Sequence, residues 1–160
     1  MGKEIERKYL LRNDAWREGA QGLHFRQGYL STEPERTVRV RQVGQRGLLT
    51  VKGLTRGITR AEFEYDIPLA DAARLLDELC LRPLIEKTRY RVQHGGLTWE
   101  IDEFHGENAG LVVAEVELER EDQEVPLPDW VGKEVSGDSR YFNSNLAVHP
   151  YSQWGGQAED

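Results

Sequence analysis

The sequence predicts a mainly β protein with flanking helices, an α+β class in which an antiparallel sheet curls into a barrel around a charged interior. Two observations favour this class. Charged and apolar residues alternate along most of the chain, which is the side-chain period of a β-strand. The alternating stretches are short and are joined by turns that contain glycine or proline, which is typical of antiparallel strands.

Composition limits the class of protein further. The chain of 160 residues fits one domain, which we place at residues 1–150, followed by a polar, glycine-rich tail at 151–160. The single Cys80 excludes an internal disulfide and a multi-cysteine zinc site. The net charge of −7 argues against a nucleic-acid partner, and no apolar run is long enough for a membrane span. Because no apolar signal-peptide core opens the sequence, we expect a cytoplasmic protein.

The first half of the chain is predicted to be almost entirely strand. The predicted strands are residues 4–10, 24–31, 37–43, 48–52 and 59–67. Between the first two, Asn13 to Trp16 has the pattern of a helix N-cap and a short first turn. Residues 45–47, Gln-Arg-Gly, have the composition of a hairpin turn.

The second half opens with a change of period. Apolar residues recur at i, i+3, i+4 and i+7 within residues 70–81, which predicts an amphipathic helix that ends before Pro83. Strands are then predicted at residues 84–93, 97–104 and 111–119, and short helical pieces around 128–131 and 139–146. The order of strands, one long helix, strands and short helices fits an antiparallel sheet better than a repeat protein.

The charged face of these strands is unusual, because each strand carries mainly one sign of charge at i, i+2 spacing. The acids are Glu4, Glu6, Glu62, Glu64, Glu100, Asp102, Glu115, Glu117 and Glu119. The bases are Lys8, Arg39, Arg41, Lys52, Lys87, Arg89 and Arg91. A face in water usually mixes signs, and neighbouring like charges repel. A barrel with this face inward lets acids and bases meet across the lumen, and its outer apolar face then needs cover from helices such as 70–81 or from a second copy in a homodimer.

A charged lumen of this composition indicates particular ligands. Buried charges are costly unless they are paired or coordinated. Carboxylate oxygens suit Mg²⁺ or Mn²⁺, and arginine forks and lysines suit phosphate oxygens. The face is therefore interpreted as a polyphosphate site with one or two metal ions.

The ordered set of charged motifs, from Glu4-x-Glu6-x-Lys8 to Glu115-x-Glu117, resembles the CYTH superfamily, also called triphosphate tunnel metalloenzymes, over about residues 2–147. The resemblance implies an eight-stranded antiparallel β-barrel that forms a tunnel for a triphosphate and a divalent metal. The implied substrate-binding residues are Lys8, Arg39, Arg41, Lys52, Lys87, Arg89, Arg91 and Lys133, the last as the candidate to close one tunnel mouth. The implied metal ligands are Glu4, Glu6, Glu62, Glu64, Asp102, Glu115 and Glu117. A tyrosine that pairs with the motif lysine in short bacterial members corresponds to Tyr29, so Lys8 and Tyr29 are the catalytic candidates.

Short bacterial members of this superfamily are inorganic triphosphatases, so the resemblance implies hydrolysis of tripolyphosphate to pyrophosphate and phosphate with Mg²⁺ or Mn²⁺. Alternatives stay open: a class IV adenylate cyclase, a thiamine or nucleoside triphosphatase, or a module that binds polyphosphate without cleaving it. The assigned inward positions are nearly all charged, which suits a bare phosphate chain better than a nucleoside. The acidic residues argue against a simple polyanion binder, to which they would be of no use.

Overall fold

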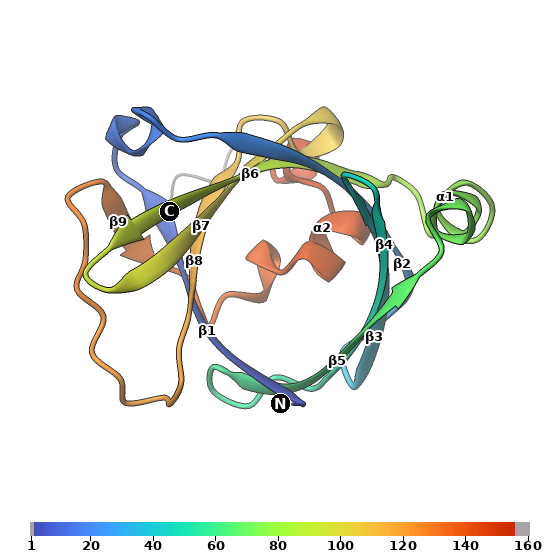
Figure 1. Ribbon diagram of the computed structural model, residues 1–160, viewed down its shortest axis with the longest axis horizontal. Coiled ribbons are helices and arrows are strands. Elements are labelled where there is room, and N and C mark those ends of the chain that lie inside the picture. The colour runs from blue at the N-terminus through green and yellow to red at the C-terminus, as the bar shows by residue number, and fades with distance from the viewer. Residues whose placement is uncertain (1, 156–160) are drawn as a thin grey trace.

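In the computed structural model, which describes residues 2–155, eight antiparallel strands close into a ring (Figure 1). The order around the ring is β5-β4-β3-β2-β6-β7-β8-β1, and β1 pairs back to β5. The ring strands are β1 (Lys3–Leu11), β2 (Gly22–Glu33), β3 (Arg36–Val43), β4 (Arg46–Gly53), β5 (Thr59–Ile67), β6 (Ile85–His94), β7 (Leu97–Phe104) and β8 (Val112–Glu117). The predicted fold class is confirmed.

The two faces of each ring strand follow the alternation in the sequence. In β8, Glu115 faces the interior, whereas Ala114 and Val116 belong to a buried apolar cluster outside the ring. In β1, Lys8 faces the interior and Tyr9 belongs to the same outer cluster. Because side chains alternate at every residue, one strand can serve the charged lumen and the apolar core together.

Helix α1 (Leu69–Glu78) covers part of the outer face, as the helical period predicted. Its Ala72 and Leu76 are fully buried against Val40 of β3. A Cβ on Gly47 of β4 would lie 2.8 Å from the Cβ of Ala72, so glycine allows this close approach. The hairpin turn predicted at residues 45–47 lies slightly earlier in the chain, at Gly44 and Gln45, because Arg46 and Gly47 already belong to β4.

Other segments cover the opposite side of the ring. The loop between β8 and β9 (Val131–Glu134) and the short helix η1 (Ala15–Arg17) lie outside the ring (Figure 1). Their Trp130 and Trp16 belong to one buried cluster with Trp99 of β7, which is fully buried. The helix expected around residues 128–131 is wrong, because Val131 pairs with β1 as the first residue of a strand. On β5, Phe63 and Tyr65 stay 50% and 58% exposed, and the homodimer remains a prediction.

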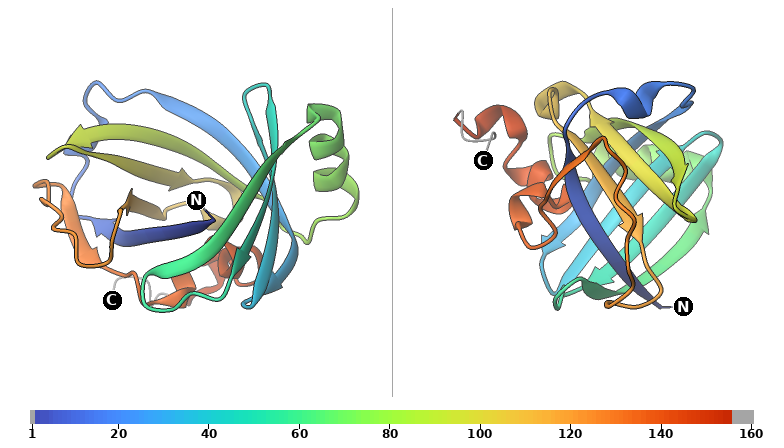
Figure 2. Two further views of the ribbon diagram at one scale, coloured as in Figure 1. Left: turned by 60° about the horizontal axis from the view of Figure 1, so that its bottom comes forward. Right: turned by 90° about the vertical axis from the view of Figure 1, so that its left-hand side faces the viewer.

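The C-terminal segment lies across one end of the ring (Figure 2). It consists of η3 (Ser139–Tyr141), α2 (Asn143–Val148) and η4 (Tyr151–Gln153), and the remaining short helix of the described chain is η2 (Gly106–Asn108). Leu146 and Trp154 pack in one buried cluster with Ile85 of β6. The polar tail predicted from residue 151 includes η4 and the buried Trp154, and its residues 156–160 lie outside the described part of the chain. No helix within residues 2–155 is long and apolar enough to cross a membrane.

Candidate active site

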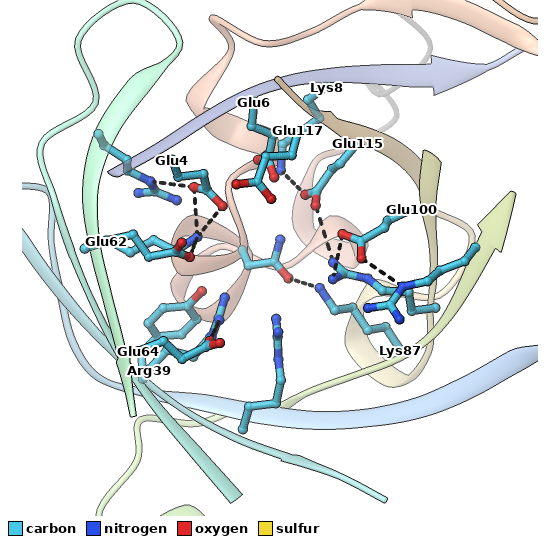
Figure 3. Close-up of a pocket in the computed structure, with 17 residues that line it drawn as sticks. Glu4, Glu6, Lys8, Arg39, Glu62, Glu64, Lys87, Glu100, Glu115 and Glu117 are labelled. Atoms are coloured by element: carbon cyan, nitrogen blue, oxygen red, sulfur yellow. Dashed lines mark hydrogen bonds and ion pairs between the residues drawn. The ribbon is translucent and has the colours of Figure 1, made fainter. Parts of the chain in front are cut away.

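The ring encloses a cavity of about 230 Å³ whose wall is almost entirely charged (Figure 3). The lining residues are Glu4, Glu6, Lys8, Tyr29, Arg39, Arg41, Lys52, Arg60, Glu62, Glu64, Lys87, Arg89, Arg91, Glu100, Glu115, Glu117 and Asn143. Acids and bases in this set nearly balance. The acid excess expected from the sequence disappears because Arg60 joins the wall, whereas Asp102 and Glu119, which follows β8, do not.

Two carboxylates on adjacent strands have no positive partner. Glu6 of β1 lies directly opposite Glu117 of β8 in the strand register. Within residues 2–155 neither side chain makes a hydrogen bond or an ion pair. Burial, with Glu115 and Glu4 nearby, raises the pKa of Glu6 well above its usual value. Burial also raises the pKa of Glu117, so the charged forms of both carboxylates are disfavoured until a further cation is present.

The neighbouring acids are each paired. The Lys52 ammonium lies 3.1 Å from Glu4, and the Lys8 ammonium lies 2.8 Å from Glu115 (Figure 3). Burial works against ionisation of both acids, but Lys52 lowers the pKa of Glu4, and Lys8 and Arg89 hold the pKa of Glu115 well below its usual value. Although burial opposes it, the carboxylates of Glu115 and Glu6 raise the pKa of Lys8, which favours its charged form.

Asp102 has a different place from the one predicted. It is 1% exposed and lies behind the cavity wall. Its oxygens accept from Lys87 Nζ at 2.7 Å and from Arg89 Nε at 2.7 Å. Although burial favours the neutral acid, these two bases lower the pKa of Asp102 to about 2. The carboxylate therefore holds two bases in position and has no free oxygen directed at the cavity.

The basic side of the wall contains one arginine without an acid. Arg41 donates to Gln27 at 2.8 Å and pairs with no carboxylate within residues 2–155. Burial, together with Arg39 and Arg89, lowers the pKa of Arg41 to about 9. In Arg39, the buried Nε has no hydrogen-bond acceptor in the described structure. Unpaired positive groups that crowd one another favour an anionic ligand with several oxygens.

The residues present fit a divalent cation shared with a phosphate ligand. Glu6 and Glu117 offer hard oxygen donors with no competing partner. No group of three or more histidine, cysteine or acidic side chains in the described chain forms a ready-made metal site. Magnesium in phosphate-handling proteins is typically held by one or two carboxylates plus substrate oxygens, so an incomplete shell is the arrangement that such a cation needs.

Two further predicted residues need comment. Tyr29 lines the cavity, but it makes no hydrogen bond with Lys8, whose ammonium donates to Glu115 at 2.8 Å and to the Tyr141 carbonyl at 3.4 Å. Lys133 lies exposed on β9 outside the ring and does not line the cavity. The structure therefore brings the predicted set together with the exceptions of Lys133 and the recessed Asp102.

Three wall or supporting residues were missing from the predicted set. Arg60 lies two residues before Glu62, and alternate residues of a strand face the same side, so the alternation could have predicted that Arg60 lines the cavity. Gln27 is fully buried and lies two residues before Tyr29 on β2 in the same way. Asn143 comes from α2, beyond all the ring strands, and no pattern in the sequence indicates that its side chain enters the cavity.

Comparison with known proteins agrees with this geometry. The model of the family described as CYTH domain matches residues 2–151. An inorganic triphosphatase of Acetivibrio thermocellus is 51% identical over 96% of this chain and 99% of its own length. An inorganic triphosphatase of Nitrosomonas europaea is 36% identical over 91% of this chain and 97% of its own.

Solved structures give the same picture. The crystal structure of an inorganic triphosphatase superposes with a TM-score of 0.64 at 34% identity and covers 90% of this chain and 97% of that one. A Hippeastrum protein, an adenylyl cyclase candidate with a dominant triphosphatase activity, superposes with a TM-score of 0.55 at 15% identity over 73% of this chain and 80% of its own. At that identity the second likeness shows the fold alone.

Proposed function

Because this chain belongs to the CYTH family, we propose that it is an inorganic triphosphatase that cleaves tripolyphosphate to pyrophosphate and phosphate with a divalent cation. The relatives that cover almost the whole chain carry this activity in their names. The proposal is also supported by the size and polarity of the cavity, which suit a short phosphate chain without a nucleoside.

The single observation that carries the proposal is the pattern of unpaired charge. Nearly every charged group on the wall has a partner of opposite sign, but Glu6 and Glu117 lack a cation and Arg41 lacks an anion within the described residues. A metal ion with a triphosphate supplies both missing charges together. A binder of polyanions alone has no use for the uncompensated acids.

The basic residues position the substrate. Arg41 and Arg39 present guanidinium groups, which bind phosphate oxygens in pairs, and the Lys52 ammonium, paired with Glu4, also lines the cavity. Lys87 and Arg89 are anchored by Asp102, so their remaining donors are held in place before the substrate arrives. Lys8, held charged by Glu115, is a phosphate ligand and stabilises the negative charge that develops on the chain.

The acidic residues that fit the metal are Glu6 and Glu117. Their neighbours Glu4, Glu62, Glu64 and Glu115 lose their ion pairs with lysine or arginine when phosphate binds those bases. A bound Mg²⁺ or Mn²⁺ supplies charge neutralisation at phosphate oxygens and a more acidic water. We leave Asp102 out of this set, because both of its oxygens already accept from buried bases.

The test is phosphate release from tripolyphosphate, pyrophosphate, ATP and thiamine triphosphate, each with Mg²⁺, with Mn²⁺ and with excess chelator. We expect tripolyphosphate to be cleaved far faster than the others, and only with a divalent ion. Full activity in chelator would refute the metal requirement, and no cleavage of tripolyphosphate under any condition would refute the function. A cytoplasmic location, proposed on the absence of membrane-spanning helices in residues 2–155, is tested by cell fractionation.

A further inference from the structure

Asn143 reaches the cavity from the segment that lies across one end of the ring. It is the first residue of α2, and its side chain forms part of the cavity wall. Its Oδ1 accepts two hydrogen bonds, one from Gln27 Nε2 at 3.0 Å and one from Lys87 Nζ at 3.0 Å. A neutral residue of the C-terminal segment thus contacts the buried polar groups behind the basic wall.

The orientation of this amide follows from its partners. Lysine can only donate, so Asn143 must turn its oxygen toward Lys87. Gln27 must then offer its nitrogen to that oxygen, which turns the Gln27 oxygen toward Arg41. Arginine also only donates, and the Arg41 Nε lies 2.8 Å from the Gln27 oxygen. Each amide therefore has one orientation that satisfies every partner.

The same orientation leaves the Asn143 Nδ2 without an acceptor. Within residues 2–155 its two N–H groups make no hydrogen bond, although the residue lines the cavity. Three cations, Lys87, Arg41 and Arg89, already crowd this part of the wall, since each carries its charge close to the others. An uncharged donor adds a hydrogen bond to an anion here without adding repulsion between cations.

We propose that Asn143 binds the substrate directly, with Nδ2 donating to a phosphate oxygen of the inorganic triphosphate while Oδ1 fixes Lys87. The inference rests on the proposed function and names a further ligand of the same site. It also gives the C-terminal segment a part in substrate recognition, because the donor comes from α2 and not from a strand of the ring.

The experiment is a calorimetric titration of the full chain with tripolyphosphate in chelated, metal-free buffer, preceded by a thermal melt of every variant. Asn143→Asp keeps an oxygen for Lys87 and Gln27 but replaces the donor with a carboxylate oxygen. We expect its Kd to rise by about tenfold or more, and by more than that of Asn143→Ala. Asn145→Asp adds the same charge to the same helix, at a side chain that donates to the Ser139 carbonyl outside the cavity, and should bind like the wild type.

Each outcome decides the question. If Asn143→Asp binds within twofold of the wild type while Asn143→Ala binds weakly, Asn143 only positions Lys87 and the direct contact is refuted. Asn143→Leu, of similar volume, replaces the aspartate variant should that one fail to fold; because it removes both Nδ2 and Oδ1, binding within twofold of the wild type would refute the direct contact. Absence of tripolyphosphate cleavage by the wild type with Mg²⁺ or Mn²⁺ would refute the proposed function itself, whereas equal binding by wild type and Asn143→Asp refutes only the present inference.

Discussion

Replacement of Glu6 by glutamine should make the protein more stable while it removes activity. Glu6 lies in register opposite Glu117, close to Glu115 and Glu4, and makes no hydrogen bond or ion pair in the described chain. Glutamine keeps the shape of the side chain and removes its charge. Without a divalent cation the variant therefore loses a repulsion from Glu115 and Glu4 that exceeds the attraction of the nearby lysines, whereas with substrate present it loses a metal donor.

The size of the effect can be worked out from the strand register. Side chains on directly opposite residues have Cβ atoms about 5 Å apart, so the two carboxylates come within roughly 6 Å. At an effective dielectric constant near 20 the repulsion at that distance is about 3 kcal/mol, and water in the cavity reduces it to about 1–2 kcal/mol. For a domain of this size such a change corresponds to a rise in Tm of about 2–8 °C.

The assay is thermal unfolding of wild type and Glu6→Gln in chelator at two pH values. Since the fold raises the pKa of Glu6, wild type loses stability relative to the variant as pH increases above the unfolded value of about 4.5. The difference in Tm should therefore appear at pH 7.5 and become small near pH 4, where the carboxyl is mostly neutral in both states. Added Mg²⁺ should stabilise wild type more than the variant. Glu35→Gln, in the exposed turn before β3, is the control and should change nothing. A variant no more stable than wild type at pH 7.5 would refute the idea of an uncompensated acidic wall.

Three other predictions concern the basic wall and the reaction. Arg41→Ala should lower kcat/KM for tripolyphosphate about tenfold or more in steady-state kinetics, and Arg41→Lys should restore it only in part. Arg74→Ala, on the exposed side of α1, is the control and should have no effect. A fully active Arg41→Ala variant would contradict this prediction. Because burial lowers the pKa of Lys87 to about 7, tripolyphosphate binding should weaken as pH rises through 7 and Lys87 loses its charge, and Lys87→Arg should remove that loss in a pH series of titrations. Incubation with ATP and Mn²⁺ should give no cyclic AMP by chromatography, and a peak comparable to phosphate release from tripolyphosphate would favour the cyclase.

The strands and their inward faces could be predicted from the sequence because a strand alternates its side chains regardless of what it pairs with. Arg39 and Arg41 reach the cavity for that reason alone. The same rule does not show how deeply a side chain is buried. Asp102 is on the same strand face as Glu100, but it lies behind the cavity wall, where Lys87 and Arg89 donate to both of its oxygens.

The C-terminal region was predicted less well, because tertiary packing determines it. Trp130 lies at the T-shaped angle to Trp99 on the outside of the ring, with ring centroids 5.7 Å apart, and the chain that follows it pairs with β1. That pairing overrides the helix expected at 128–131 and carries Lys133 away from the cavity. Asn143 enters the cavity only because the segment after β9 turns back across the end of the ring.

The pairing of charges also explains how the protein keeps such a cavity without its ligands. Lys52 with Glu4, and Lys8 with Glu115, are ion pairs that neutralise the wall in the free protein. A triphosphate competes with Glu4 and Glu115 for the two lysines, and a divalent cation competes with the lysines for the two carboxylates. Each ligand therefore breaks an ion pair that must also break for the other ligand to bind. We therefore expect binding of one to expose partners for the other, so that the ion pairs themselves produce positive coupling between a divalent cation and triphosphate, with no movement of the ring required.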